Sequence, residues 1–469
     1  MKYLHHNNLF LLSLIAFFAT SCLKDSGTQL AQPSSDASVL HVAIQNSSYS
    51  PNASLAEFTI DNVSDSIYNL DSLPYGTKID SLFLNFRFAS SIGFIINDTV
   101  SESPGFYNTT QGSTTKHVDF TNPVKIKNLA TDEETTKEYV IELRVHKVEP
   151  YKHVWSELNS NITAQISDNQ KAVQLNGKFF YYFGHADSNS LFTSLDAKNW
   201  QNDARLDGLP LNAKLRDMVV FNNAIYLLHN GVELYKSTNG VFWTKHNIVA
   251  DTAYDYVSLL FGFKNNLWAV AKEKTSNNVR IANSADGINW TLSGNKIFND
   301  NFPVSDFATT TFRPKLGREK TIVIGGYSPS GKRLNTIWSA ENRAISDTLN
   351  WLDLQNANSK IDPVSNASVE YYGSKLLMLG GTTDTHTIDT TQLRQSINEG
   401  MNWVLPDSTT NVLPEKFTPR VNASLIMDAK DNSLYVIGGK SVTAPLADVW
   451  KIKVNFYSFK DYIENPYKY

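Results

Sequence analysis

The chain has 469 residues, of which 41% are hydrophobic and 12% aromatic, and its formal net charge is −4. This length allows one large β domain and a smaller one. The negative charge and the lack of any Lys/Arg run exclude a nucleic-acid-binding protein of the basic-patch type.

The N-terminus has the pattern of a bacterial lipoprotein signal. Lys2 precedes the apolar run 9–18, and small residues then lead to Cys22, the single cysteine of the chain. A run of this length is too short for a comfortable transmembrane helix. We therefore expect residues 1–21 to be cleaved and Cys22 to be acylated, although Ala19 replaces the usual Leu. The alternative is an ordinary cleaved signal peptide with a spare cysteine.

Residues 22–38 carry the acylated cysteine and are rich in Ser, Asp, Gln and Pro, which predicts a flexible tether. Leu23 follows the cysteine in place of the Asp associated with inner-membrane retention. Lys24-Asp25 resembles the charged export tag of Bacteroides-type surface lipoproteins. The resemblance implies a lipid-anchored outer-membrane protein with exposure on the cell surface. A periplasmic orientation remains open.

Residues 39–149 are predicted to form a small β-sandwich. Alternating apolar residues mark strands at 39–44, 81–88 and 138–145. The segment from Val118 to Ile126 and the strand after it are similar to the last strands of bacterial Ig-like domains. Such modules act as spacers, and Pro150 marks the boundary with the next domain.

Residues 150–469 contain a repeat, because six tryptophans recur at intervals of 45, 43, 47, 61 and 52 residues. A large aromatic residue returning at this period, with strands and tight turns between, is typical of a β-propeller. The tryptophans are Trp155, Trp200, Trp243, Trp290, Trp351 and Trp403.

Four of these tryptophans follow a hairpin motif. The segments 237–243 and 284–290 read Ser-x-Asp/Asn-Gly-x-x-Trp, 396–403 has one extra residue, and 194–200 lacks the glycine. Asp or Asn accepts backbone N–H groups in such a turn, and Gly takes a positive φ. The motif resembles the Asp-box of sialidase-like propellers. The segment 419–450 resembles a kelch repeat.

Counting strands predicts six blades. Five units each close at a Trp-led outer strand, whereas the last unit, which starts at Pro419, has three strands and no terminal Trp. The strand around Trp155 is therefore predicted to complete the last blade and to close the ring without an exposed sheet edge. The predicted fold class is all-β: a six-bladed β-propeller preceded by an Ig-like β-sandwich.

These parts together resemble an uncharacterised family of Bacteroides-type lipoproteins with an N-terminal Ig-like domain and a kelch-like or galactose-oxidase-like propeller. That family is a domain of unknown function. The resemblance implies location and fold, and it implies no activity.

The motifs of known propeller enzymes are incomplete. Phe312-Arg313-Pro314 resembles the arginine motif of sialidases but lies in the fourth unit, where a turn before a strand is the simpler interpretation. The copper chemistry of galactose oxidase needs a cysteine cross-linked to tyrosine, and Cys22 is the anchor. Asp384, His386 and Asp389 could hold a cation, but an ordinary polar loop is favoured. We therefore expect no catalytic residue, no cofactor and no metal.

Polar residues recur where the innermost strands begin, at the predicted mouth of the central channel. Such side chains could hydrogen-bond sugar hydroxyls, or they could simply cap strands and face solvent. The candidate ligand-binding residues are Arg216, Asp217, Asp255, Tyr256, Asp306, Asn366, Arg420 and Asn422.

Three functions follow from the sequence. The leading hypothesis is a non-catalytic surface module that binds glycan or protein through its propeller and the membrane through its lipid anchor. The alternatives are a glycoside hydrolase or lyase of sialidase-like lineage, and a structural envelope protein. Two carboxylates in the channel would favour the hydrolase.

Overall fold

The computed structural model describes residues 33–97, 99–101, 110–315, 317–341, 348–355, 361–384, 393–405 and 411–455. Strands predominate in these segments, and none of their helices is long and apolar enough to cross a membrane. The predicted signal peptide, Cys22 and most of the tether lie outside the described residues. Two compact units divide the chain between Lys147 and Val148.

The first unit contains two sheets. The three-stranded sheet has the order β1-β4-β7, and the six-stranded sheet has the order β2-β3-β9-β8-β5-β6. All neighbours are antiparallel except β3 and β9, which are parallel. The strands are β1 (Val39–Ile44), β2 (Phe58–Asp61), β3 (Ser66–Asn69), β4 (Leu84–Phe88), β5 (Gly93–Ile96), β6 (Thr99–Ser101), β7 (Gln111–Ser113), β8 (Val124–Leu129) and β9 (Thr136–Glu142).

One hydrophobic core joins these two sheets. In β4, Leu84, Phe86 and Phe88 are buried while the residues between them are exposed, as expected for a strand with one face on a core. Phe94 of β5 packs on both phenylalanines, with ring centroids 5.2 and 5.3 Å away. The alternation read from the sequence therefore places the apolar side chains on the inner face of each sheet.

The second unit contains six sheets, five of them made of consecutive stretches of chain and one that joins β10 to the last three strands, plus one two-stranded pair. The strands of the first three sheets are β11 (Asn169–Leu175), β12 (Lys178–Gly184), β13 (Asn189–Ser194), β14 (Gln201–Asn202); β15 (Val219–Phe221), β16 (Ala224–His229), β17 (Glu233–Ser237), β18 (Thr244–Asn247); β19 (Tyr254–Phe263), β20 (Asn266–Glu273), β21 (Val279–Ser284) and β22 (Thr291–Leu292).

The remaining sheets follow the same order along the chain. Their strands are β23 (Ala308–Phe312), β24 (Lys320–Ile324), β25 (Ile337–Glu341), β26 (Asn350–Asp353); β28 (Ser368–Tyr372), β29 (Lys375–Leu379), β31 (Arg394–Ser396); and β32 (Ser424–Asp428), β33 (Ser433–Lys440), β34 (Pro445–Val454) with β10 (His153–Asn159). The pair is β27 (Val364–Ser365) with β30 (Thr382–Thr383).

Tight turns fix the register of the inner hairpins. Asn176 and Gly177 join β11 to β12 with φ angles of 50° and 76°, and Leu175 pairs with Lys178 across the turn. Two positive φ angles are those of a type I′ turn, whose twist matches that of paired strands. Asn222 and Asn223 do the same between β15 and β16.

The Trp-bearing hairpins are held by local hydrogen bonds. Oδ1 of Asp286 accepts the backbone N–H groups of Ile288 and Asn289 at 2.7 and 2.8 Å. The indole Nε1 of Trp290 donates to the carbonyl of Gly287 at 2.9 Å, which fixes the ring over the turn. These bonds stabilise the outer turn, so the acid of the motif has a structural role there.

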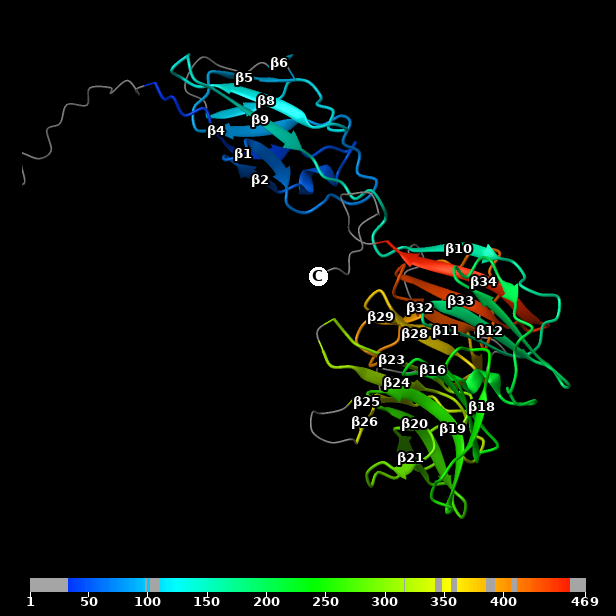
Figure 1. Cartoon of the computed structure of the whole chain (residues 1–469). Coiled ribbons are helices and arrows are strands. Elements are labelled where there is room, and N and C mark those ends of the chain that lie inside the picture. The colour runs from blue at the N-terminus through cyan, green and yellow to red at the C-terminus, as the bar shows by residue number, and fades with distance from the viewer. Residues whose placement is uncertain are drawn as a thin grey trace, which may run out of the picture. The chain divides into compact units, whose positions relative to one another are not determined.

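The strand around Trp155 pairs with the last strand of the unit. β10 and β34 run antiparallel, with Trp155 opposite Ile452 and His153 opposite Val454. Figure 1 shows the two strands side by side although they come from opposite ends of the domain sequence. The second unit thus contributes its first strand to the sheet that contains its last described strand.

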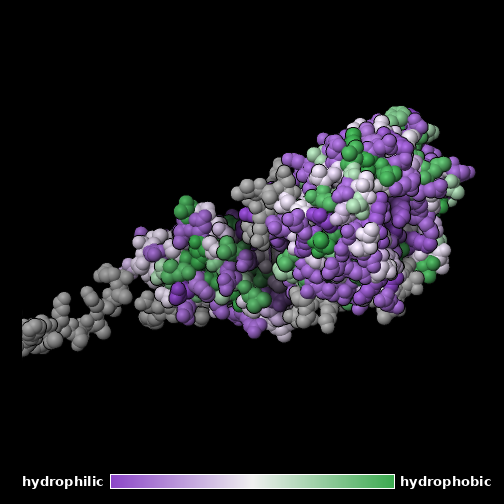
Figure 2. All heavy atoms as spheres, turned by 90° about the horizontal axis from the view of Figure 1, so that it is seen from below, coloured by the Kyte–Doolittle hydropathy of each residue, from purple (hydrophilic) through white to green (hydrophobic). Residues whose placement is uncertain are grey.

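The first strands of neighbouring sheets contact one another in the order β11, β15, β19, β23, β28 and β32, and β32 contacts β11 again. The buried hydrophobic clusters lie between adjacent sheets: Tyr182 of the first and Trp243 of the second, for example, belong to one cluster. On the face seen in Figure 2, the larger unit is mostly hydrophilic with scattered hydrophobic residues. Most of its apolar residues are thus buried between neighbouring sheets.

Candidate functional site: the central cavity and its mouth

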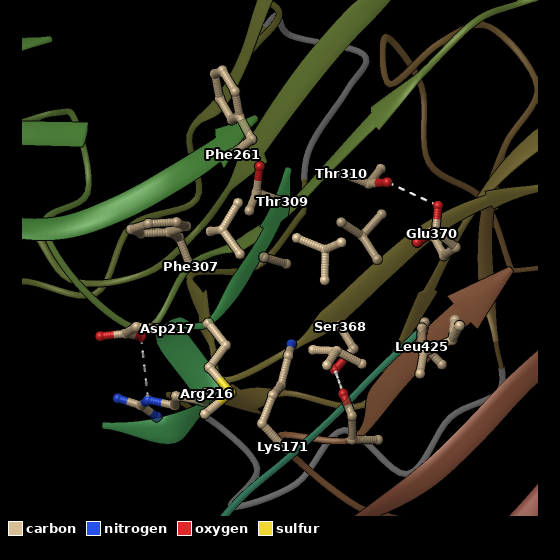
Figure 3. A pocket seen from close by; sticks show the side chains of 18 of the residues that line it. Lys171, Arg216, Asp217, Phe261, Phe307, Thr309, Thr310, Ser368, Glu370 and Leu425 are labelled. Atoms are coloured by element: carbon tan, nitrogen blue, oxygen red, sulfur yellow. Dashed lines mark hydrogen bonds and ion pairs between the residues drawn. The ribbon is translucent and has the colours of Figure 1, made fainter. Parts of the chain in front are cut away.

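A cavity of about 410 Å³ lies where the six first strands meet. Residues of β11, β15, β19, β23, β28 and β32, or of the turns just before them, all line it. Figure 3 shows side chains from these elements pointing toward the same space, with Lys171 and Glu370 among them. Neither of the two other cavities described below draws on every sheet of the unit.

Arg216 gathers three of the predicted residues at the mouth of this cavity. It lies in the 3-10 turn η2 (Leu215–Asp217), directly before β15. Its guanidinium forms an ion pair with Asp306 and donates to Oδ1 of Asn366 at 2.7 Å. A longer contact of 3.5 Å reaches Oδ1 of Asn422. The structure therefore brings these four of the predicted residues together in one place.

The same backbone conformation recurs at Asp306, Asn366 and Asn422, which have φ angles of 60°, 59° and 55°. The N–H of Asn366 donates to the carbonyl of Asp306 at 2.8 Å, and the N–H of Asn422 donates to that of Asn366 at 2.9 Å. Asn and Asp tolerate this left-handed region better than other residues with a side chain. These repeated positions link neighbouring sheets around the mouth.

Asp217 lines the cavity beside Arg216, with 4.0 Å between Oδ1 and Nε. Burial raises the pKa of the Asp217 carboxyl, and the positive charges of Arg216, Lys214 and Lys171 partly oppose this effect. Asp217 is also part of the wall of a second cavity.

Asp255 and Tyr256 are not brought to the mouth. They line the second cavity, of about 650 Å³, between the second and third sheets. Asp255 is 59% exposed and lies 3.8 Å from Nζ of Lys274. Tyr256 is 3% exposed and packs edge-on against Trp290.

Arg420 is also away from the cavity lining and is 1% exposed. Its guanidinium forms a bidentate pair with Asp448, in which Nη2 and Oδ2 are 2.8 Å apart. It donates further bonds to the carbonyls of Thr418 and Gly438 and stacks over the ring of Phe417, 4.3 Å from its centroid. All of these hydrogen bonds and contacts are made to other residues of the protein, so Arg420 holds the last sheet together.

A third cavity, of about 310 Å³, adjoins the first two. Arg216 lines the first and third cavities, Asp217 the first and second, and Lys214 the second and third. The short turn η2 and the residue before it are thus a wall shared by all three spaces.

The cavity interior holds two charged residues that the sequence prediction missed. Lys171 of β11 and Glu370 of β28 both line it. Oε1 of Glu370 accepts from Oγ1 of Thr310 at 2.8 Å and from the N–H of Tyr371 at 2.9 Å. Burial raises the pKa of Glu370 to about 7, although these hydrogen bonds and the charge of Lys171 favour the ionised form. Burial likewise lowers the pKa of Lys171.

A sequence signal for these two residues existed. Each is the one charged residue of a first strand in which no residue is exposed. A buried charge in such a strand costs free energy unless it has a partner or faces a cavity.

Cation ligation finds no support in the described segments, where no group of three His, Cys, Asp or Glu residues could hold a metal. His386 and Asp389 of the candidate cation loop lie outside the described residues. Asp384, from the same loop, forms an ion pair with Arg333.

Comparison with protein families matches residues 149–462 to the DUF6242 beta propeller domain. The chain belongs to the DUF6242 family. Residues 32–143 match the DUF6242 N-terminal domain, a domain of unknown function, so the two matched stretches cover the two compact units. The second unit of this DUF6242 protein is therefore a β-propeller, and its sheets are the blades. No curated protein matched the chain.

Proposed function

We propose that this DUF6242 protein is a lipid-anchored envelope protein whose propeller channel binds a glycan. The observation that supports the proposal best is the central cavity, to which every first strand contributes and whose mouth carries Arg216, Asp306, Asn366 and Asn422. Carboxylates, amides and a guanidinium at one opening match the hydroxyl groups of sugars, which both donate and accept. The adjoining cavities leave space for further sugar units.

The propeller has six blades in this proposal. Support comes from the cyclic contacts of the first strands and from the pairing of β10 with β34, which closes the last blade. The Trp-bearing hairpins are taken as Asp-boxes, and the Arg420–Asp448 pair with Trp450 as the core of a kelch-like blade.

The remaining parts of the proposal rest on the sequence. Acylation of Cys22 would hold the protein at the outer membrane, and Lys24-Asp25 would direct it to the cell surface. The first unit would act as an Ig-like spacer between the lipid and the propeller. Globomycin-sensitive processing and labelling of the protein with palmitate test the anchor, and a C22A variant is the control.

Binding is tested with a glycan array probed by residues 23–469, followed by calorimetric titration of the best ligand. Thr309→Val and Asp217→Asn change the cavity with little change of shape. Oγ1 of Thr309 is buried without a partner among the described residues, so the Val variant loses only a contact available to a ligand. One lost hydrogen bond corresponds to about a twofold to tenfold weaker affinity.

Thr244→Val on the outer strand β18 is the matched control and should bind like the wild-type protein. Binding that all variants retain would move the ligand site away from the channel. An array without any signal would favour a protein ligand, and affinity for envelope or host proteins would then replace the glycan proposal.

A second candidate, a glycoside hydrolase, is favoured by the presence of two carboxyl groups, those of Asp217 and Glu370, on one cavity. A carboxyl with a pKa of about 7 is suited to act as a general acid. Release of reducing ends from polysaccharides that is lost in both Glu370→Gln and Asp217→Asn would establish hydrolysis. Turnover unchanged in either variant would exclude this pair.

A further inference from the structure

Lys171 is the one charged residue of the cavity that lacks a close partner among the described residues. The charged side chains that line the cavity are Lys171, Arg216, Asp217, Asp306 and Glu370, while β19 and β32 contribute none. Arg216 forms an ion pair with Asp306, and its Nε lies 4.0 Å from Oδ1 of Asp217. Lys171 interacts with Asp217 and Glu370 only through longer-range electrostatics, without a hydrogen bond or salt bridge.

The geometry leaves this ammonium group turned toward empty space. Figure 3 shows Nζ of Lys171 pointing into the cavity between the labelled side chains of β23, β28 and η2. Lys171 is partly buried, and a cation withdrawn from water without a partner is unfavourable, as the lowered pKa of Lys171 indicates. An anion from a ligand would compensate the charge, because charge-assisted hydrogen bonds are the strong ones in a low-dielectric site.

We infer that the channel binds an acidic sugar, with the sugar carboxylate on Nζ of Lys171 and sugar hydroxyls on Thr309 and Glu370. This inference rests on the proposed glycan binding and specifies its ligand class. Uronic acids and sialic acids share the chemistry, and both can come as free sugars or as parts of a polymer. The cavity of about 410 Å³ exceeds the volume of one sugar ring, so a unit within a chain also fits.

Glu370 couples this binding to pH. Its neutral carboxyl can donate a hydrogen bond to the ligand, whereas the ionised form repels a carboxylate on Lys171. The raised pKa of about 7 means that Glu370 loses its proton across the neutral range. Affinity for an acidic sugar should therefore fall as the pH rises from 6 to 8. Asp217, Asp306 and Arg216 are the other charged groups that line this cavity beside Lys171, and burial also raises the pKa of Asp217.

The test compares a uronic acid trisaccharide with its carboxyl-reduced form, which differs only in having CH₂OH in place of each carboxylate. Calorimetric titration at pH 6 should give affinity about tenfold or more higher for the acid, and Lys171→Met should abolish the difference. Lys245→Met, on the outer strand β18 and away from all three cavities, is the matched control and should preserve it. Free glucuronate and N-acetylneuraminate, titrated alongside, separate a free sugar from a polymer unit as the source of the carboxylate.

Glu370→Gln provides a second, independent readout. The affinity of the wild-type protein for the acid should fall about severalfold between pH 6 and 8, whereas the affinity of the Gln variant should not change. Equal affinity for the two trisaccharides, or a difference that survives Lys171→Met, would overturn the inference while leaving glycan binding intact. Lack of binding to acidic glycans on the array, with neutral glycans bound, would also overturn it. An array without any signal would instead remove the proposed function itself.

Discussion

At the scale of single residues, two arginines with the same predicted role have different ones. Arg216 lies at an opening and gathers Asp306 and Asn366, whereas Arg420 is enclosed and pairs with Asp448. The difference follows from what each side chain can reach. Asp448 is 28 residues from Arg420 and becomes its neighbour only when β33 and β34 have paired. A residue that lies just before the first strand of a sheet therefore cannot be predicted to contact a ligand from that position alone.

Arg420→Ala should destabilise the propeller strongly, by about 3–5 kcal/mol, because the largely buried carboxylate of Asp448 would lose its cation and keep only the indole N–H of Trp450. Arg205 offers a matched control, since it also pairs with an aspartate, Asp203, but its side chain is 70% exposed. Arg205→Ala should cost about 0–1 kcal/mol. Urea unfolding followed by tryptophan fluorescence measures both, and equal midpoints would refute the structural role of Arg420.

At the scale of elements, hairpins with local hydrogen bonds could be predicted, whereas the register of an irregular strand could not. The Trp-bearing hairpins were found from Ser, Asp or Asn, and Gly, because their hydrogen bonds span a few residues. The residues Asp255 and Tyr256 were misaligned with the other units because β19 contains two register shifts, after Tyr256 and after Leu259. A β-bulge adds a residue without any strong mark in the sequence.

The pairing of β10 with β34 makes Trp155 a residue of the seam between two sheets. Its ring lies 5.0 Å from that of Phe417 and 6.4 Å from that of Trp450. Trp155→Ala should lower the free energy of unfolding by about 3 kcal/mol or more. Val154→Ala is the control on the same strand, where the side chain is 44% exposed and the cost should be about 0.5 kcal/mol or less. Thermal melts that coincide for the two variants would contradict the packing of this seam.

At the scale of the whole molecule, each unit has hydrophobic clusters of its own. The core of the first unit draws on both of its sheets, and the clusters of the second unit follow its blades. The sequence analysis set a domain boundary at Pro150 because the tryptophan period and the Trp-bearing hairpins occur only after it. The residues inside the channel were not predicted. Lys171 and Glu370 are 199 residues apart, and only the folded propeller brings their strands to one cavity.

Residues 148–469 should fold without the first unit. Each unit buries enough apolar surface in its own core to form a cooperative domain. Scanning calorimetry of residues 23–469 should give two transitions, and the isolated propeller should reproduce one of them within about 3 °C. A propeller fragment that fails to melt cooperatively would show that the units depend on each other.

The closing strand pair has one more consequence, which concerns connectivity. Because His153 is opposite Val454, the polypeptide enters and leaves the propeller at the same point, with the two ends about 5 Å apart. A short peptide could therefore join them and make the domain circular, and new ends could be opened at an exposed turn elsewhere. The propeller can also be inserted as a single block into a surface loop of another protein, since such a loop needs to open by no more than the width of one strand pair.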